Sequence, residues 1–242
     1  MPGALEPALE GRKLRAGLSI GAGNGRKEIA LVQAGLVERF ALYELSNELG
    51  ARARRAIAES GLTGQMTVHI ADAFAAAHPP YDLVYWDHAL HHMLDVDAPA
   101  DCGVDALAPG GLLMINNYVG PTRLQWTREQ VALARRYMEA AAPHLGARPH
   151  VPQKTVLHRW RLMLRDPSEA PQSDRILSAC RAACDGWAPE PIGCAMISIC
   201  GRHVVPIAAE DNPALDMLID WDRRAKAEGH SHFAFGIWRK PG

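Results

Sequence analysis

Short apolar runs alternate with amphipathic segments through the first half of the chain. The segment 46–60, for example, carries Leu49, Ala53 and Ile57 at helical spacing, and Gly61 follows it as a stop signal. By the same pattern we expect helices at 26–34, 46–60 and 97–107, and strands at 14–20, 40–43, 66–70, 81–86 and 111–116. Strands that alternate with helices build βαβ units, so the pattern predicts an α/β fold in which a parallel sheet has helices on both faces.

The second half of the chain is less regular. Thr127 and Gln130 have the spacing of a capping box, which predicts a helix from there to about Ala141. Residues 142–175 are rich in Pro, Arg and His, and we expect them to form an insertion over the sheet with a helix near 154–164. Further on, the pattern predicts a helix at 173–184, strand-like runs at 195–199 and 232–238, and a helix at 213–228 between these two runs.

Composition narrows the class of protein. The 242 residues carry 26 Lys and Arg against 27 Asp and Glu, so neither a generally basic nucleic-acid binder nor an acidic disordered chain is expected. The longest apolar runs, such as 193–201, are too short to cross a bilayer, which takes about 20 residues. Residues 1–15 hold no apolar signal segment, and the five cysteines form no CxxC pair. We therefore expect one cytoplasmic domain over residues 1–242, with reduced thiols and no membrane partner.

A glycine-rich turn follows the first predicted strand. Gly21, Gly23 and Gly25 let the backbone turn sharply and pass close to a ligand. The dinucleotide fingerprint G-x-G-x-x-G would need a glycine at the position of Arg26, so the pattern here is G-x-G-x-G instead. Such a loop can curve around a small zwitterion, and an ordinary tight turn is the less favoured alternative.

Acidic residues follow the next strands. Glu44 stands where a carboxylate accepts hydrogen bonds from the vicinal hydroxyls of a ribose, although a solvated carboxylate at a strand end is a competing interpretation. Asp72 could accept a hydrogen bond from the exocyclic amine of a base, with Phe74 near the ring. The fourth strand runs into Asp87 and His88.

In order and spacing, these features resemble class I S-adenosylmethionine-dependent methyltransferases of the small-molecule type. The resemblance spans about residues 14–118, and its motifs are the glycine loop, Glu44, Ala71-Asp72, Tyr81-Asp82-Leu83-Val84, Leu90-His91-His92 and Leu107-Ala108-Pro109-Gly110-Gly111. It implies a Rossmann-like three-layer sandwich whose seven-stranded, mostly parallel sheet has an antiparallel last strand. It also implies S-adenosylmethionine as the cofactor.

The resemblance assigns the cofactor-binding residues by their place in these motifs. The glycines would wrap the methionine moiety, Glu44 would hold the ribose, Asp72 would meet the adenine, and Asp87 would border the sulfonium. The full set is Gly21, Ala22, Gly23, Gly25, Glu44, Leu45, Asp72, Ala73, Asp87 and His88.

This chain departs from the family pattern in two places. Ser19 stands where an acid often precedes the glycine loop. Few residues precede the first strand, so the N-terminal lid helix of many members is nearly absent. An insertion at about 121–191 is expected to replace the lid and to form part of the substrate site.

Three histidines after the fourth strand are the candidate catalytic residues: His88, His91 and His92. A histidine with a pKa near neutrality can take the proton of a hydroxyl group as that group attacks the methyl. A packing role or a cofactor contact is an equal alternative for each one. His88 and His92 would share a helix face as metal ligands do, but the sequence has no H-E-x-x-H motif and no evident third ligand, so no metal is expected.

The segment after the fifth strand is the candidate acceptor site, because ligands of open α/β sheets bind beyond the carboxyl ends of the strands. Its polar and aromatic residues are Asn116, Asn117, Tyr118, Arg123 and Trp126. Arg123 suits a carboxylate or phosphate, and the basic stretch from Arg148 to Arg165 could also meet an anionic substrate. The competing interpretations are a capped turn with Trp126 as a hydrophobic staple, and a solvated lid face.

The acceptor class follows from what the chain lacks. Asp87-His88-Ala89-Leu90 is not the [DNS]-P-P-[YFW] tetrad of many base methyltransferases, which counts against methylation of nucleic-acid bases. The net charge of -1 agrees, since phosphate contacts call for clustered Lys and Arg, so no nucleic-acid partner is expected. We expect methyl transfer to a hydroxyl or amine of a small molecule, a specialised metabolite or a saccharide. Two alternatives stay open: an enzyme that cyclises or cleaves the aminobutyryl arm of S-adenosylmethionine itself, and a cofactor-binding pseudoenzyme. The oligomeric state stays open, with a homodimer as one option.

Overall fold

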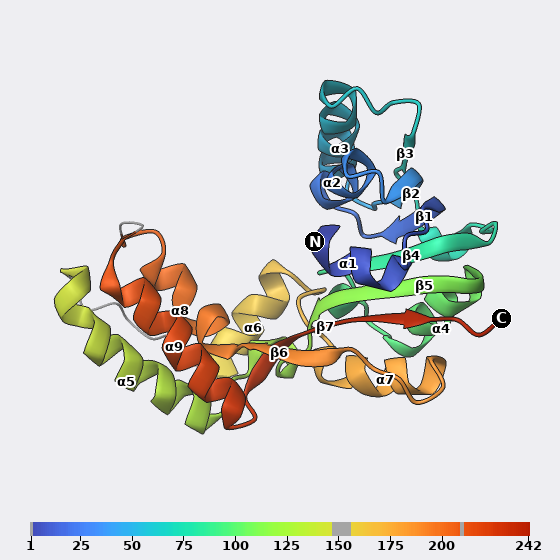
Figure 1. Cartoon of the computed structure of the whole chain (residues 1–242). Helices are drawn as coiled ribbons and strands as arrows, with labels where there is room; N and C mark the ends of the chain where they lie inside the picture. Colours follow the sequence, from blue (N-terminus) through green and yellow to red (C-terminus); the bar gives the residue numbers. More distant parts are fainter. Residues whose placement is uncertain (1, 147–155, 209–210) are drawn as a thin grey trace.

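Seven strands form one sheet in the computed structural model, which describes residues 2–146, 156–208 and 211–242 (Figure 1). Their order across the sheet is β3-β2-β1-β4-β5-β7-β6, and β7 runs antiparallel to both of its neighbours, β5 and β6, while the other pairs are parallel. The predicted α/β class with an antiparallel last strand is confirmed. The strands are β1 (Leu14–Ile20), β2 (Val37–Tyr43), β3 (Met66–His69), β4 (Tyr81–Asp87), β5 (Leu107–Tyr118), β6 (Glu190–Cys194) and β7 (Ser231–Arg239).

Helices cover both faces of the sheet because its central strands are apolar on both sides. Along β4, Leu83 and Tyr85 pack toward one face and Val84 and Trp86 toward the other, and all four are buried. The helices on the first face are α1 (Pro2–Leu9), α2 (Arg26–Gln33) and α3 (Asn47–Glu59), and those on the second are α4 (Asp97–Asp105) and α7 (Ile176–Ala183) (Figure 1).

Strand β5 begins earlier than the sequence pattern predicts. The helix predicted at 97–107 ends at Asp105. Residues 108–110, which the sequence pattern leaves between this helix and the strand predicted at 111–116, belong to β5. Tyr81 of β4 pairs with Leu107, whereas Leu83 pairs with Leu112, so the register shifts between the two pairs. A β-bulge therefore accommodates residues that look like a turn in the sequence.

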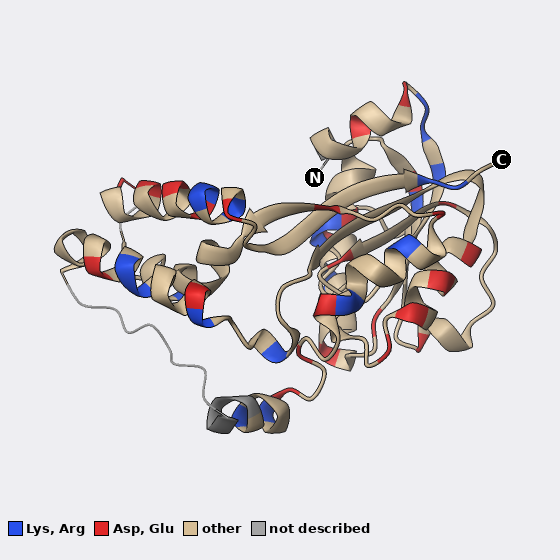
Figure 2. Ribbon diagram, turned by 90° about the horizontal axis from the view of Figure 1, so that it is seen from below, with Lys and Arg blue, Asp and Glu red and all other residues tan. Residues whose placement is uncertain are grey.

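A second group of helices lies beyond the ends of β6 and β7 (Figure 1). Helices α5 (Arg128–Leu145), α8 (Ala195–Val204) and α9 (Pro213–Ala227) pack around an apolar core of their own, and we call these three helices the helical lobe. The predicted capping box is present at the start of α5, where the Thr127 hydroxyl accepts from the Gln130 N–H at 3.1 Å and the Gln130 side chain accepts from the Thr127 N–H at 3.0 Å. Helix α6 (Val156–Arg165) stands apart from the lobe (Figure 2).

The strand predicted at 195–199 is wrong, because this apolar run is the first part of α8. Asp222 of α9 explains the difference. Its carboxylate accepts hydrogen bonds from the backbone N–H groups of Cys194 and Met196, each at 2.8 Å, and of Ile197 at 3.3 Å. The first N–H groups of a helix have no partner within the helix, so a side chain distant in the sequence caps α8.

Several predictions for the insertion stay untested. Arg148 and Lys154 lie outside the described residues, as does the start of the helix predicted near 154–164, which is described from Val156 to Arg165. The single-domain organisation and the lid role of residues 121–191 stay predictions. Among the described helices, none combines the length and the apolar character that crossing a bilayer requires.

We expect Asp222→Ala to lower the free energy of unfolding by about 1–3 kcal/mol, because it leaves buried backbone donors at the start of α8 without their charged acceptor. Asp220→Ala is the matched control, since Asp220 is exposed on the same helix and pairs only with Arg223 across one turn in the described structure. Chemical denaturation measures both variants. Equal losses for the two would show that the cap does not stabilise the lobe.

Candidate functional site

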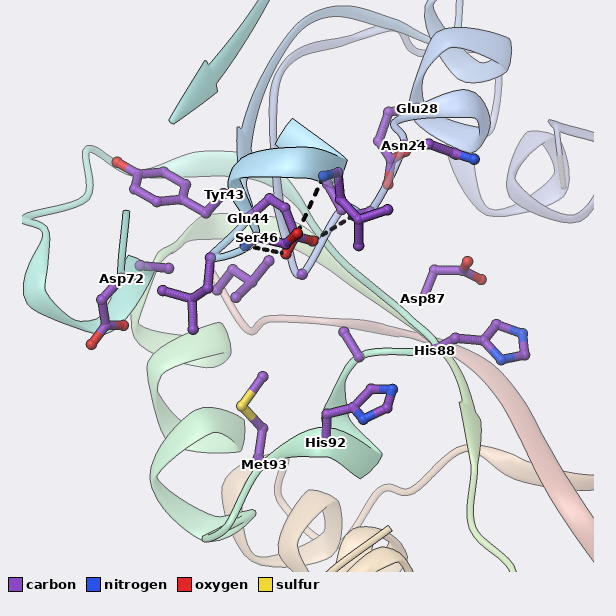
Figure 3. Close-up of a pocket in the computed structure, with 18 of the residues that line it drawn as sticks. Asn24, Glu28, Tyr43, Glu44, Ser46, Asp72, Asp87, His88, His92 and Met93 are labelled. Atoms are coloured by element: carbon purple, nitrogen blue, oxygen red, sulfur yellow. Dashed lines mark hydrogen bonds between the residues drawn. The ribbon is translucent and has the colours of Figure 1, made fainter. Parts of the chain in front are cut away.

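A pocket of about 760 Å³ opens at the carboxyl ends of β1, β2 and β4. Figure 3 shows Asp72 at one end of it and Asp87 with His88 at the other. Every predicted cofactor-binding residue except Gly25 lines the pocket, and Gly25 instead precedes α2 in the left-handed conformation. The sequence analysis missed several other lining residues: Asn24, Arg26, Lys27, Glu28, Ser46, Met93 and Ser168.

The first position of the glycine loop has room only for glycine. Gly21 has φ 69°, and a Cβ atom there would lie 2.7 Å from the Cβ of Ala89. Gly23 has φ 58° and has open space where its side chain would be. The loop therefore brings bare backbone to the pocket wall, as close approach to a ligand requires.

Glu44 holds this loop from the neighbouring strand. One carboxylate oxygen accepts from the Gly23 N–H and the other from the Ser46 N–H, both at 2.9 Å (Figure 3). Ser46 in turn caps α3 by accepting from the Leu49 N–H at 3.2 Å. Each carboxylate oxygen keeps a second lone pair, so Glu44 can still accept hydrogen bonds from a ligand in the pocket.

Large apolar side chains are exposed near Asp72. Phe74 is 42% exposed and Leu45 is 73% exposed, and both line the pocket. The Asp72 carboxylate accepts from the Phe74 N–H at 2.9 Å and so fixes the short turn η1 (Ala73–Ala75). A flat heterocycle placed here would cover exposed apolar surface and reach a carboxylate at its edge.

Asp87 is held from two sides at the other end. The Lys27 ammonium forms an ion pair with one carboxylate oxygen, and the Asn116 amide donates to the other at 2.7 Å. Asn116 is not among the pocket-lining residues. It orients a residue of the pocket instead.

Glu28 supplies a buried carboxyl group beside Ser19, at the place where the sequence departs from the family pattern. Ser19 donates a hydrogen bond to Glu28 at 2.7 Å, and Glu28 lines the pocket although it is 2% exposed. Burial raises the pKa of Glu28 to about 7, with the nearby Asp87 adding to the shift. An acid from α2 thus stands next to the strand position where the family often has one.

The three predicted catalytic histidines have different surroundings. His88 and His92 line the pocket, and His88 has φ 54°, a conformation rare for any residue but glycine. Burial lowers the pKa of His88, so its ring is neutral near pH 7. His91 lies behind them with its Nδ1 2.6 Å from the Asn117 side-chain oxygen, and burial lowers its pKa to about 4.

The predicted acceptor residues lie outside the pocket lining, and three of them, Asn116, Asn117 and Tyr118, belong to the end of β5, which is longer than the sequence pattern predicts. Tyr118 is buried and donates to the Pro121 carbonyl at 3.2 Å, and Trp126 packs in the core of the helical lobe. Arg123 donates from its guanidinium to the Pro167 and Glu169 carbonyls, so it holds the segment that carries Ser168 to the pocket.

Comparison with known proteins supports the family predicted from the sequence. Residues 18–115 match the family model of a methyltransferase domain. A search of curated proteins finds no match. The matched segment runs from within β1 to within β5 and includes the ends of β1, β2 and β4, where the pocket opens.

Three solved structures illustrate the fold. Phosphoethanolamine N-methyltransferase 2 from Haemonchus contortus, solved with S-adenosyl-L-methionine, is 16% identical with a TM-score of 0.61, over 100% of this chain and 52% of that one. The [4+2]-cyclase SpnF is 16% identical with a TM-score of 0.58, over 99% and 80%. A putative sarcosine dimethylglycine methyltransferase from Galdieria sulphuraria is 14% identical with a TM-score of 0.56, over 98% and 83%.

These likenesses concern the fold, and this chain spans about half the length of the Haemonchus enzyme. The sheet order, the glycine loop and the domain match agree with the family that the sequence motifs predict. Residues 18–115 thus match a methyltransferase-domain model, and the chain as a whole shares the fold of these solved structures.

Proposed function

We propose that this protein transfers the methyl group of S-adenosylmethionine to a hydroxyl or amine of a small molecule, a specialised metabolite or a saccharide. The observation that carries the proposal is the charge of the pocket. Its wall holds four carboxyl groups, which are Glu28, Glu44, Asp72 and Asp87, and Glu28, with its pKa raised to about 7, is only partly ionised near pH 7. Its two basic residues are Arg26 and Lys27, and Lys27 is already paired with Asp87. Such a wall suits a sulfonium cation better than the pyrophosphate of a dinucleotide.

S-adenosylmethionine is the cofactor of this methyltransferase class, and the pocket has a matching group for each part of it. Glu44 would accept from the ribose hydroxyls, and Asp72 from the adenine amine above Phe74. The backbone at Gly21 and Gly23 would face the methionine moiety, with its ammonium near the carboxylates at the Asp87 end. The cofactor supplies an electrophilic methyl group when it is bound.

We assign the role of general base to His88. It lines the pocket beside Asp87, its ring is neutral near pH 7, and its φ of 54° is a strained conformation of the kind often found at functional sites. His92 also lines the pocket, whereas His91 is turned toward Asn117. The protein's main contribution to the transfer would be to orient the two reactants.

A second candidate function is a reaction other than methyl transfer. The likeness to the SpnF cyclase over nearly the whole chain shows that this fold also carries a [4+2]-cyclase. Cyclisation or cleavage of the aminobutyryl arm of S-adenosylmethionine would leave a different product from methyl transfer. A pseudoenzyme would bind cofactor and leave it unchanged.

We expect Gly23→Val to weaken binding of S-adenosylhomocysteine by more than about tenfold, because the new side chain would fill pocket space beside the Glu44 hydrogen bond. Gly35→Val is the matched control. Gly35 has φ 70° and open space around it, but it lies in the α2–β2 turn away from the pocket. Both variants carry similar backbone strain, so calorimetry should separate them. The cofactor assignment is wrong if both bind as tightly as the unmodified chain.

Incubation with methyl-labelled S-adenosylmethionine and a metabolite extract should place the label on a small molecule and release S-adenosylhomocysteine. Mass spectrometry identifies both products. Release of methylthioadenosine without label transfer would instead indicate chemistry on the aminobutyryl arm. Binding without any product would favour a pseudoenzyme.

The same assay tests His88. We expect His88→Gln to lower label transfer by about 10²-fold or more while calorimetric binding of S-adenosylhomocysteine stays within a few-fold, since a general base contributes about 10²–10⁴-fold. His69→Gln is the control, because His69 stacks on Tyr43 and does not line the pocket. Unchanged transfer by the His88 variant would remove this residue from the reaction.

A further inference from the structure

Two histidines and a glutamate meet at the edge of the pocket. His91 and His92 belong to the short turn η2 (Leu90–His92), and Glu169 lies between α6 and the turn η4 (Ser173–Arg175). One ligand atom of each lies within 4.8 Å of the other two. The sequence offered no third ligand beside the histidines, and the fold brings one from a distant segment. We propose that His91, His92 and Glu169 bind a divalent transition-metal ion.

The surroundings of His91 set which ring nitrogen is available. Its Nδ1 is 2.6 Å from the side-chain oxygen of Asn117, and this oxygen can only accept. The proton therefore sits on Nδ1, and Nε2 keeps its lone pair. Asn117 itself is fully buried, so the ring is fixed by a rigid partner. Metal-binding histidines are held in this way through the nitrogen that does not bind the metal.

His92 has a longer and weaker contact on the other side. Its Nδ1 is 3.4 Å from the Ser168 hydroxyl, which donates its own proton to Asp166 at 2.7 Å. The hydroxyl oxygen can then accept only from an Nδ1–H group, which leaves the lone pair on Nε2. The rings of His91 and His92 lie 4.1 Å apart between centroids. One nitrogen of each ring also lies within 4.8 Å of the other and of a Glu169 carboxylate oxygen, so the two rings can bind the same cation.

The segment that carries Glu169 is anchored on both sides. The Arg123 guanidinium donates to the Glu169 carbonyl at 3.1 Å, and the Arg123 N–H donates to the Ala170 carbonyl at 2.7 Å. The buried Ser173 hydroxyl donates to the Gly120 carbonyl at 2.8 Å. Figure 2 shows acidic residues on the segment that leaves α6. The backbone is thus fixed where the carboxylate reaches the histidines.

The donor set indicates the kind of ion. Two imidazole nitrogens and one carboxylate oxygen suit zinc, manganese, iron(II), cobalt or nickel, whereas magnesium and calcium prefer oxygen ligands. Three protein ligands leave coordination positions open. Since His92 lines the pocket, such a position would lie beside it, where an acceptor hydroxyl could bind and lose its proton more easily.

The test is calorimetric titration of the full chain with Zn²⁺ and with Mn²⁺ after treatment with a chelator. We expect one ion per chain to bind at this site, and Glu169→Gln to weaken that binding by about tenfold or more. Glu139→Gln is the matched control, because Glu139 is exposed on α5, away from the cluster, and it should bind like the unmodified chain. Circular dichroism confirms that each variant is folded.

No binding of either ion, or binding that Glu169→Gln leaves unchanged, would overturn the site. Its failure is distinct from failure of the proposed function, which S-adenosylhomocysteine binding tests in the same preparations. A chain that binds S-adenosylhomocysteine and no metal refutes only the metal site. A chain that binds metal at Glu169 and no S-adenosylhomocysteine refutes only the cofactor assignment.

Discussion

The hydrogen bonds of Glu44 join the parts from which the pocket is made. One carboxylate group ties the glycine loop after β1 to the start of α3 after β2, through the N–H groups of Gly23 and Ser46. A loop of glycines has little conformational preference of its own, so it needs such a partner to keep one shape. With the loop fixed, Gly21 can pack against Ala89, which lies just after β4. These two contacts form the wall of the pocket on the side of the glycine loop.

At the opposite wall, polar side chains that were predicted to bind the substrate form hydrogen bonds to other residues of the protein. Asn116 orients Asp87, Asn117 orients His91, and Arg123 holds the segment of Ser168. Residues at the end of β5 and just after it therefore lie one layer behind the pocket. The predicted insertion contributes through Ser168, which reaches the pocket from the end of α6.

The sequence is sufficient for the parts of the fold that local pattern determines. The glycine turn, the capping box at Thr127 and the order of strands before β6 follow from residues close together in the chain. The start of β5 and the helix at 195–204 do not, because a bulge and the distant Asp222 decide them. A short apolar run fits a strand and a buried helix equally well until its backbone partners are known.

The same limit applies to the site. The predicted cofactor-binding residues stand at fixed positions after successive strands, so a motif can locate this part of the pocket lining. Tertiary contacts bring Glu28 and Ser168 to the pocket and Glu169 to the two histidines. Nothing in the local sequence marks these three residues. For Glu28 the sequence holds an indirect indication. Ser19 replaces the acid that often precedes the glycine loop, and in the structure it donates a hydrogen bond to Glu28.

The helical lobe has its own apolar core, and it adjoins the sheet where β5 and β6 end and β7 begins. Substitutions inside that core leave the contacts of Glu44 and the glycine loop untouched. Natural selection can therefore remodel one part of this molecule while the other stays constant. The two parts can therefore diverge at different rates among related chains.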